Sequence, residues 1–296
     1  MLKINKNYLL AFASSMAYSY WLIGSSIVVL MGSGSYDYFS LFIIMLISLI
    51  FSILFFKKIK KIVFTGVLSG LAFSIGNILL YILIGKINIV IAGSFTALNL
   101  VFFPLFMYSK GKRNLIKHIA GSAVIAAGLI LESLTIGNFR SDLLIISLLI
   151  GIFLGFVYAI ATYLFNVSLI REKEIKNTIF TIFLTETIFY GIFTIAFMNF
   201  SLSLVMKKEF IINNVLVSLS IFIGIYLEAR GFKGFKRYEF AKRNTVNILS
   251  NLELLPVIFL SIIEFKNYIS FYITGLVLII IGMIIISIKN NAGAGI

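Results

Sequence analysis

The chain alternates between long apolar runs and short polar segments. A helix that spans a bilayer needs about 20 residues. Runs of roughly that length fall at ten places: 9–30, 37–56, 63–85, 88–108, 115–135, 142–167, 178–198, 210–229, 244–264 and 268–288. The pattern predicts an all-α integral membrane protein with ten transmembrane helices joined by short connections.

The composition narrows the class of protein further. Of the 296 residues, 60% are hydrophobic and 12% are charged, whereas soluble domains are about half apolar. The chain has no cysteine, which excludes disulfides, thiol catalysis and thiolate metal sites. His118 is the single histidine. We therefore expect no metal and no cofactor.

The basic residues predict the orientation of the chain in the membrane. If the ten runs cross in alternate directions, the connections on the side away from both termini hold only Lys86, Arg140, Lys207, Lys208 and Lys266 of the 25 Lys and Arg. Positive residues collect on the cytoplasmic side. We therefore expect a multi-pass protein of the cell membrane, inner or plasma, with both termini cytoplasmic. The net charge of +14 then reflects topology in contact with membrane lipid, and not nucleic acid. Binding of anionic lipid by the basic cluster at 230–243 is a secondary alternative.

The two halves of the chain repeat one order of residues. Each has an asparagine, a proline five residues later, and two glycines seven residues apart: Asn99, Pro104, Gly121 and Gly128, then Asn251, Pro256, Gly275 and Gly282. Because five spans is an odd number, two such halves would insert in opposite directions. This predicts two inverted five-helix repeats, at 1–135 and 142–288.

The motifs of both halves resemble a known family. The stretch from Asn247 to Pro256, followed by Glu264 and the two later glycines, is similar to the second EamA repeat of the drug/metabolite transporter superfamily. Residues 97–104 resemble its first-repeat counterpart, with Lys112 in the place equivalent to Glu264. The resemblance implies a ten-helix transporter whose third, fourth, eighth and ninth helices line the pathway.

Two carboxylates fall in the middle of predicted spans. Glu186 and Glu253 lie about eight and nine residues into their runs. An ionisable group at that depth costs on the order of 2.5–3.5 kcal/mol, which makes it a functional candidate. Each would contact a substrate amine or couple transport to protons; alternatively, each is a hydrogen-bonded glutamate that locks two helices together.

Amide side chains provide further substrate-binding candidates. Asn99 and Asn251 lie mid-span at equivalent places of the two halves, where a cavity between repeats would be. Their amides can donate and accept hydrogen bonds toward a polar solute. The alternative is interhelical hydrogen bonding that holds the bundle together.

Aromatic side chains cluster in the first and sixth runs. Tyr18, Tyr20 and Trp21 lie in the first run, and Tyr158 and Tyr163 lie in the sixth, which is its equivalent by repeat order. Aromatic faces can line a pocket for a cationic or ring-bearing ligand. Lipid contact is the alternative.

The two prolines are candidates for a hinge or gate. Pro104 and Pro256 each remove a backbone donor inside a predicted helix and should bend it. The bend either serves a gate or only shapes the packing.

Charged residues at the cytoplasmic ends of the eighth and ninth spans form a last candidate group. Glu228 and Arg230, with Lys242 and Arg243, could form an ion pair that braces a closed gate. A solvated interface is the alternative.

These features predict a secondary transporter, not an enzyme. No nucleotide-binding motif of the type GxxxxGK[ST] occurs in the chain, and an intramembrane enzyme would need a Ser/His or paired-Asp arrangement at membrane depth that the chain lacks. We expect export of a small organic solute such as a metabolite, amino acid or drug-like compound, by a monomer or homodimer. The alternatives are an uptake permease of the same fold and a lipid-translocating or scaffold protein.

Overall fold

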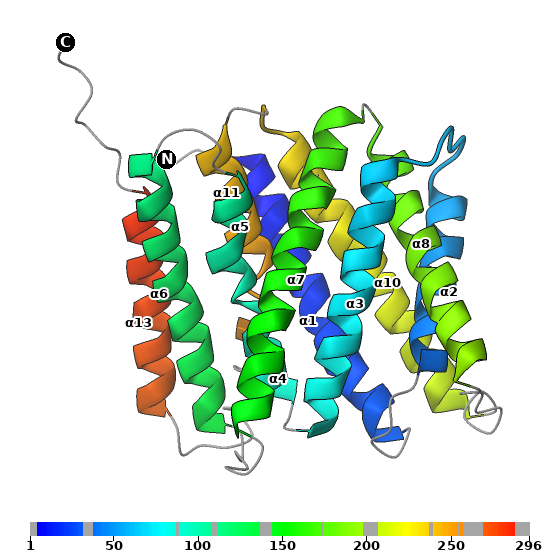
Figure 1. Cartoon of the computed structure of the whole chain (residues 1–296), viewed down its shortest axis with the longest axis horizontal. Helices are drawn as coiled ribbons and strands as arrows, with labels where there is room; N and C mark the ends of the chain where they lie inside the picture. The colour runs from blue at the N-terminus through cyan, green and yellow to red at the C-terminus, as the bar shows by residue number, and fades with distance from the viewer. Residues whose placement is uncertain are drawn as a thin grey trace.

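Long helices lying side by side make up the computed structural model of this chain (Figure 1). The structure describes residues 5–31, 38–86, 89–107, 112–136, 144–172, 174–197, 207–236, 239–253, 255–256 and 269–287. The helices are α1 (Lys6–Met31), α2 (Tyr38–Phe55), α3 (Phe64–Lys86), α4 (Ile89–Thr96), α5 (Asn99–Met107), α6 (Lys112–Ile136), α7 (Leu144–Arg171), α8 (Ile175–Ala196), α10 (Lys208–Lys233), α11 (Phe240–Ser250) and α13 (Ile269–Ser287).

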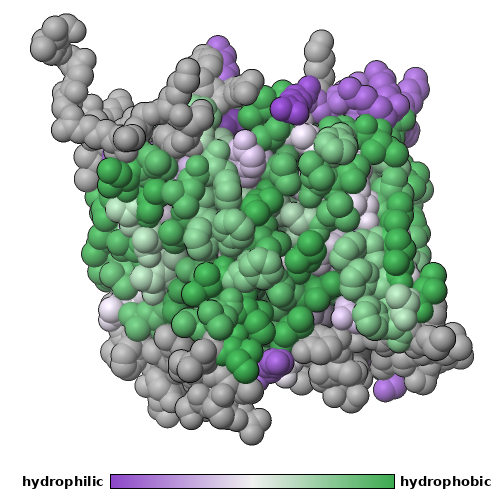
Figure 2. Space-filling view, in the orientation of Figure 1, coloured by the Kyte–Doolittle hydropathy of each residue, from purple (hydrophilic) through white to green (hydrophobic). Residues whose placement is uncertain are grey.

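The surface of the bundle is that of a membrane protein. Five of the described helices are long and apolar enough to cross a membrane, namely α2, α3, α8, α10 and residues Ile146–Arg171 of α7. Large apolar side chains such as Phe64, Leu54 and Ile195 are more than two-thirds exposed. Figure 2 shows a broad apolar belt below a polar patch at one end of the bundle. Exposing such a large apolar surface to water is unfavourable, so the belt faces lipid.

Two of the predicted spans contain a break in the helix. Within the run 88–108, α4 ends at Thr96, a turn occupies 97–98, and α5 begins at Asn99. Within the run 244–264, α11 ends at Ser250 and a turn occupies 251–253. Residues 257–264 of that run lie outside the described residues.

The first break lies before Pro104, not at it. Pro104 lies inside α5, six residues beyond the turn. The Thr96 hydroxyl donates to the carbonyl of Gly93 at 2.6 Å. In a regular helix this carbonyl would accept from the backbone N–H four residues later, so the hydroxyl competes with the helical hydrogen bond. The N–H groups of Ala97 and Leu98 then bond three residues back, at 3.1 Å each. A polar side chain, and not the proline, therefore accompanies this break.

The second break does involve its proline. Pro256 has no N–H to donate to the carbonyl four residues before it, which is that of Leu252. The N–H of Leu255 bonds this carbonyl instead, at 3.1 Å. The turn at 251–253 therefore lies just N-terminal to Pro256, which belongs to the helical residues 255–256.

The helices α6 and α13 pack closely through the four repeated glycines. A Cβ built on Gly121 would lie 2.8 Å from the carbonyl oxygen of Gly282, and one built on Gly128 would lie 2.7 Å from that of Gly275. Each glycine of one helix thus faces a glycine of the other, so the two backbones touch at both levels. Figure 1 shows this pair at one edge of the bundle.

We expect Gly128→Ala to lower the melting temperature of the detergent-solubilised chain. Its Cβ would lie 2.7 Å from the backbone carbonyl oxygen of Gly275, which cannot move aside. Overpacking of this kind costs about 1–3 kcal/mol. The matched control is Gly191→Ala, whose Cβ would meet only the Phe42 ring, at 3.2 Å. Both changes gain the same helix propensity, so equal melting temperatures would contradict the close seam.

Candidate functional site

A cavity lies inside the bundle, between helices from both halves of the chain. It holds about 80 Å³ of space for the centres of water molecules. A single water needs about 10–15 Å³ by this measure, so the cavity takes several waters or a solute of a few heavy atoms. Its wall includes Met45, Phe73, Asn77, Thr96, Thr162, Ile221, Ile225, Glu228 and Ser250, together with the residues discussed next.

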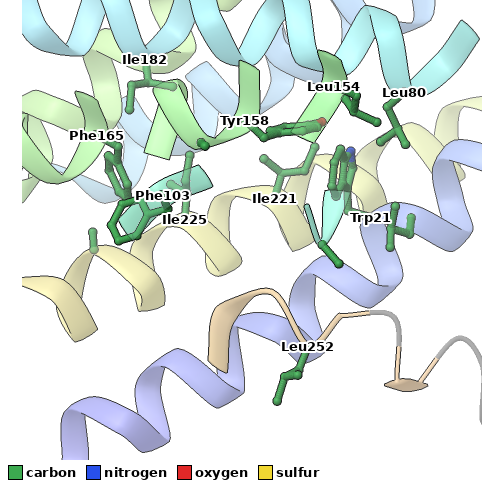
Figure 3. Close-up of a cluster of buried hydrophobic side chains, with 14 of the residues drawn as sticks. Trp21, Leu80, Phe103, Leu154, Tyr158, Phe165, Ile182, Ile221, Ile225 and Leu252 are labelled. Atoms are coloured by element: carbon green, nitrogen blue, oxygen red, sulfur yellow. The ribbon is translucent and has the colours of Figure 1, made fainter. Parts of the chain in front are cut away.

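The structure brings seven of the residues singled out in the sequence to this one cavity. They are Tyr18, Trp21, Asn99, Tyr158, Glu186, Asn251 and Glu253. Figure 3 shows Trp21 of α1 and Tyr158 of α7 in the same interior region as Ile221 and Ile225 of α10. The two prolines and Tyr20 do not belong to the wall, and Tyr20 faces outward. The wall also includes α1, α2, α7 and α8, and so extends beyond the four spans that the family resemblance implies.

The two helix breaks meet at the cavity. The Asn99 amide donates to the Asn251 side-chain oxygen at 3.2 Å, and also to the Thr162 hydroxyl at 3.4 Å. Asn251 in turn donates to the carbonyl of Asn247 at 2.8 Å. The asparagines thus connect helices to each other while lining the cavity. The Asn99 side-chain oxygen is buried and has no hydrogen-bond partner among the described residues.

Glu228 is a wall residue that the sequence analysis placed elsewhere. Its two carboxyl oxygens accept hydrogen bonds from the hydroxyls of Tyr18, at 2.8 Å, and Ser250, at 3.1 Å. Neither account considered for this group, an ion pair or a solvated interface, therefore holds for Glu228, which is buried and bound by hydroxyls. The signal that could have found Glu228 is helical spacing, because it continues the buried stripe of Val217, Ile221 and Ile225 along α10.

The basic residues expected beside Glu228 have other partners. Arg243 is fully enclosed and donates to the backbone carbonyls of Phe232 and Phe235, at 2.9 Å each, and to the side chain of Asn166. Lys242 pairs with Glu239 at 2.5 Å. Arg243 thus holds the end of α10 through carbonyl groups and not through a carboxylate.

The other two carboxyls of the wall are less engaged. One Glu253 oxygen receives a 3.4 Å contact from the Thr96 hydroxyl, and the Glu253 backbone carbonyl accepts from Ser19 at 2.7 Å. Glu186 is 3% exposed and has no side-chain hydrogen bond to any residue that the structure describes. Across the described wall there is no Lys, Arg or His. The site is therefore acidic and has no basic counterpart.

Searches of protein-family models and of curated proteins found no match to this chain.

Three phenylalanines close the cavity toward the end of the bundle that carries the polar patch. Phe103, Phe165 and Phe232 each lie about one helical turn beyond a wall residue on α5, α7 and α10. All three are fully buried, and the ring of Phe232 lies 6.3 Å from that of Phe103 and 6.2 Å from that of Phe165. They form an apolar layer between the cavity and this end.

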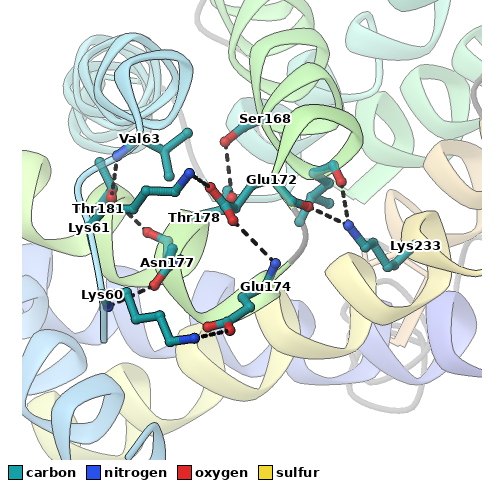
Figure 4. Close-up of polar contacts among 11 residues, drawn as sticks. Lys60, Lys61, Val63, Ser168, Glu172, Glu174, Asn177, Thr178, Thr181 and Lys233 are labelled. Atoms are coloured by element: carbon teal, nitrogen blue, oxygen red, sulfur yellow. Dashed lines mark hydrogen bonds and ion pairs between the residues drawn. The ribbon is translucent and has the colours of Figure 1, made fainter. Parts of the chain in front are cut away.

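A set of ion pairs covers the same end, which we name the basic end (Figure 4). Lys61 pairs with Glu172 at 2.8 Å, and Glu174 pairs with both Lys60 and Lys176 at 3.0 Å. Lys233 of α10 donates to the backbone carbonyls of Leu169, at 2.8 Å, and Glu172. These contacts tie the α2–α3 connection to the α7–α8 connection and to the end of α10.

We expect the Lys61–Glu172 pair to stabilise the chain only above acidic pH. The hydrogen bond from Lys61 holds the pKa of Glu172 below its usual value of 4.5. A lowered pKa contributes stability that is complete above 4.5 and is lost as the pH falls through the folded-state value. Lys61 is mostly exposed, so Lys61→Met should cost at most about 1 kcal/mol at neutral pH.

The measurement is the melting temperature against pH for the two chains. The curves should be separate at pH 7 and should converge as the pH falls below 4.5. Lys57→Met is the control, because Lys57 is exposed and its side chain pairs with no carboxylate of the described part of the chain. A separation that persists at low pH would show that Lys61 acts by packing instead.

Proposed function

We propose that this chain is a secondary transporter that moves a small organic solute through the described cavity by alternating access. The observation that carries the proposal is a cavity with carboxyl and amide groups on its wall, at the place where two helices break inside an apolar bundle. Interrupted helices at membrane depth are the usual setting of substrate sites in such transporters. A scaffold protein would have no need of a cavity lined by three buried carboxyls.

The packing of the helices supports an arrangement as two inverted repeats of five spans, 1–135 and 142–288. In two five-span repeats, span one corresponds to span six and span three to span eight, so α1 corresponds to α7 and α3 to α10. The helices α1 and α10 pack together, and so do their counterparts α7 and α3. The helices α6 and α13, spans five and ten, also correspond to each other, and each contributes two glycines to their contact. A two-fold relation between halves would produce both patterns. It also supports the resemblance to the EamA repeats of the drug/metabolite transporter superfamily.

The carboxyls of the cavity would serve solute binding or ion coupling. Glu186 and Glu253 have few partners inside the protein, so they are free to exchange a proton or a bound cation during the cycle. Glu228, held by two hydroxyls, would keep its place. No step of this scheme requires a nucleotide or another cofactor.

Alternating access can be tested without knowing the solute, because the chain has no cysteine of its own. Thr162→Cys places one thiol on the cavity wall. In sealed vesicles, a small membrane-impermeant methanethiosulfonate should modify this thiol when added on either side, and mass spectrometry of the intact chain would measure the extent.

Ser52→Cys is the matched control, since Ser52 is buried in α2 but is not part of the wall. It should stay unmodified from both sides. Modification of the Thr162→Cys thiol from one side only, or from neither, would contradict alternating access and would indicate a one-sided pocket.

The proposed orientation places the basic end in the cytoplasm. Lys57→Cys lies at the basic end and Lys207→Cys at the start of α10, on the opposite end, and both positions are exposed. In intact cells, an impermeant maleimide should label only the Lys207→Cys chain, and permeabilised cells should add label on the Lys57→Cys chain. The reverse pattern would overturn the orientation.

A further inference from the structure

We propose that the solute of this cavity is a small organic ammonium ion. The inference rests on the proposed function for the statement that the ion is transported. The binding itself is argued from the wall of the cavity alone.

The first argument is the charge of the wall. Glu186, Glu228 and Glu253 lie around about 80 Å³ of space, and the described wall has no basic side chain. A buried carboxylate is costly unless a proton or a cation neutralises it. A cationic solute supplies that charge from outside the protein.

The second argument is the balance of hydrogen-bond donors and acceptors. The amide donors of Asn251 both point back to Asn247, at 2.8 and 3.0 Å, and the Tyr158 hydroxyl donates to Asn77 at 2.6 Å. The acceptors are less occupied, because the buried Asn99 oxygen and the Glu186 carboxyl have no partners among the described residues. The Glu186 carboxyl of the wall is thus an acceptor without a donor in the described protein, which fits a group that donates, as an ammonium does.

The third argument separates an organic cation from a metal ion. Within the part of the chain that the structure describes, no group of three or more carboxylate or histidine side chains could hold a metal ion. The three carboxyls belong to α8, α10 and the turn after α11, on different parts of the wall. The rings of Trp21 and Phe73 add apolar surface and π faces that suit an alkylammonium.

The same features oppose amino acids and other carboxylates. A zwitterion would bring a negative group among three carboxyls, and the described wall has no basic side chain to receive it. The small volume opposes large ring systems. The structure thus narrows the broad set of organic solutes to compact ions with a positive charge and no negative one.

Trp21 makes the inference measurable on the intact chain. It is the single tryptophan of the sequence and it lines the cavity, so its fluorescence reports occupancy. The purified full chain would be titrated with propylammonium, 1-propanol, propionate and β-alanine, which are similar in size. We expect a saturable change with propylammonium and binding at least about tenfold weaker for the other three, since hydrogen bonds to charged groups are the stronger ones.

Variants test which groups hold the ion. Glu253→Gln and Glu186→Gln should each weaken propylammonium binding by about tenfold or more. Glu209→Gln, an exposed position in the first turn of α10, is the control and should bind as the parent chain does. Unchanged melting temperatures would show that the variants remain folded. Unchanged binding in both cavity variants, or no response of the parent chain to propylammonium, would overturn the inference.

Flux in proteoliposomes separates this inference from the transport proposal. Propylammonium binding without saturable flux would support the ammonium site and contradict transport. Saturable flux of propionate, β-alanine or 1-propanol in a chain that does not bind propylammonium would support transport and overturn the ammonium site.

Discussion

In lipid, backbone N–H and C=O groups have no water to bond, and a helix that stops inside a membrane bundle leaves several of them exposed. The chain meets this constraint at its two breaks with side chains. Ser19 donates to the carbonyl of Glu253, Thr96 to that of Gly93, and Asn251 to that of Asn247. Because these hydroxyls and amides donate to backbone carbonyls at the breaks, they lie close to the breaks. The polar lining of the cavity is thus in part a consequence of interrupting the helices.

The helix α7 packs closely against the first break through two glycines. A Cβ on Gly151 of α7 would lie 2.4 Å from the Phe95 ring, and one on Gly155 would lie 2.4 Å from the Cβ of Leu98. The absence of side chains at these two positions lets α7 lie directly against the turn between α4 and α5. The break is therefore covered by protein and not by lipid.

The sequence predicted the helices well and the breaks poorly, for one physical reason. Hydropathy measures how apolar a segment is, and most observed helices begin and end within a few residues of the predicted runs. The turn at 97–98 is as apolar as the helices beside it, so hydropathy cannot detect it. Pro104 pointed to a bend at the wrong residue, because the interruption is accompanied by the hydroxyl of Thr96.

The wall of the cavity was partly within reach of the sequence. Mid-span depth and repeat symmetry identified Glu186, Glu253 and both asparagines, and the structure brings them to one cavity. Depth alone missed Glu228, because it lies close in the chain to the basic residues of the bundle end, whereas helix rotation turns it inward. The seam of α6 and α13 does not line the cavity. Since glycine backbones touch there without side chains to repack, this seam holds α6 and α13 together as one stiff pair beside the helices that line the cavity.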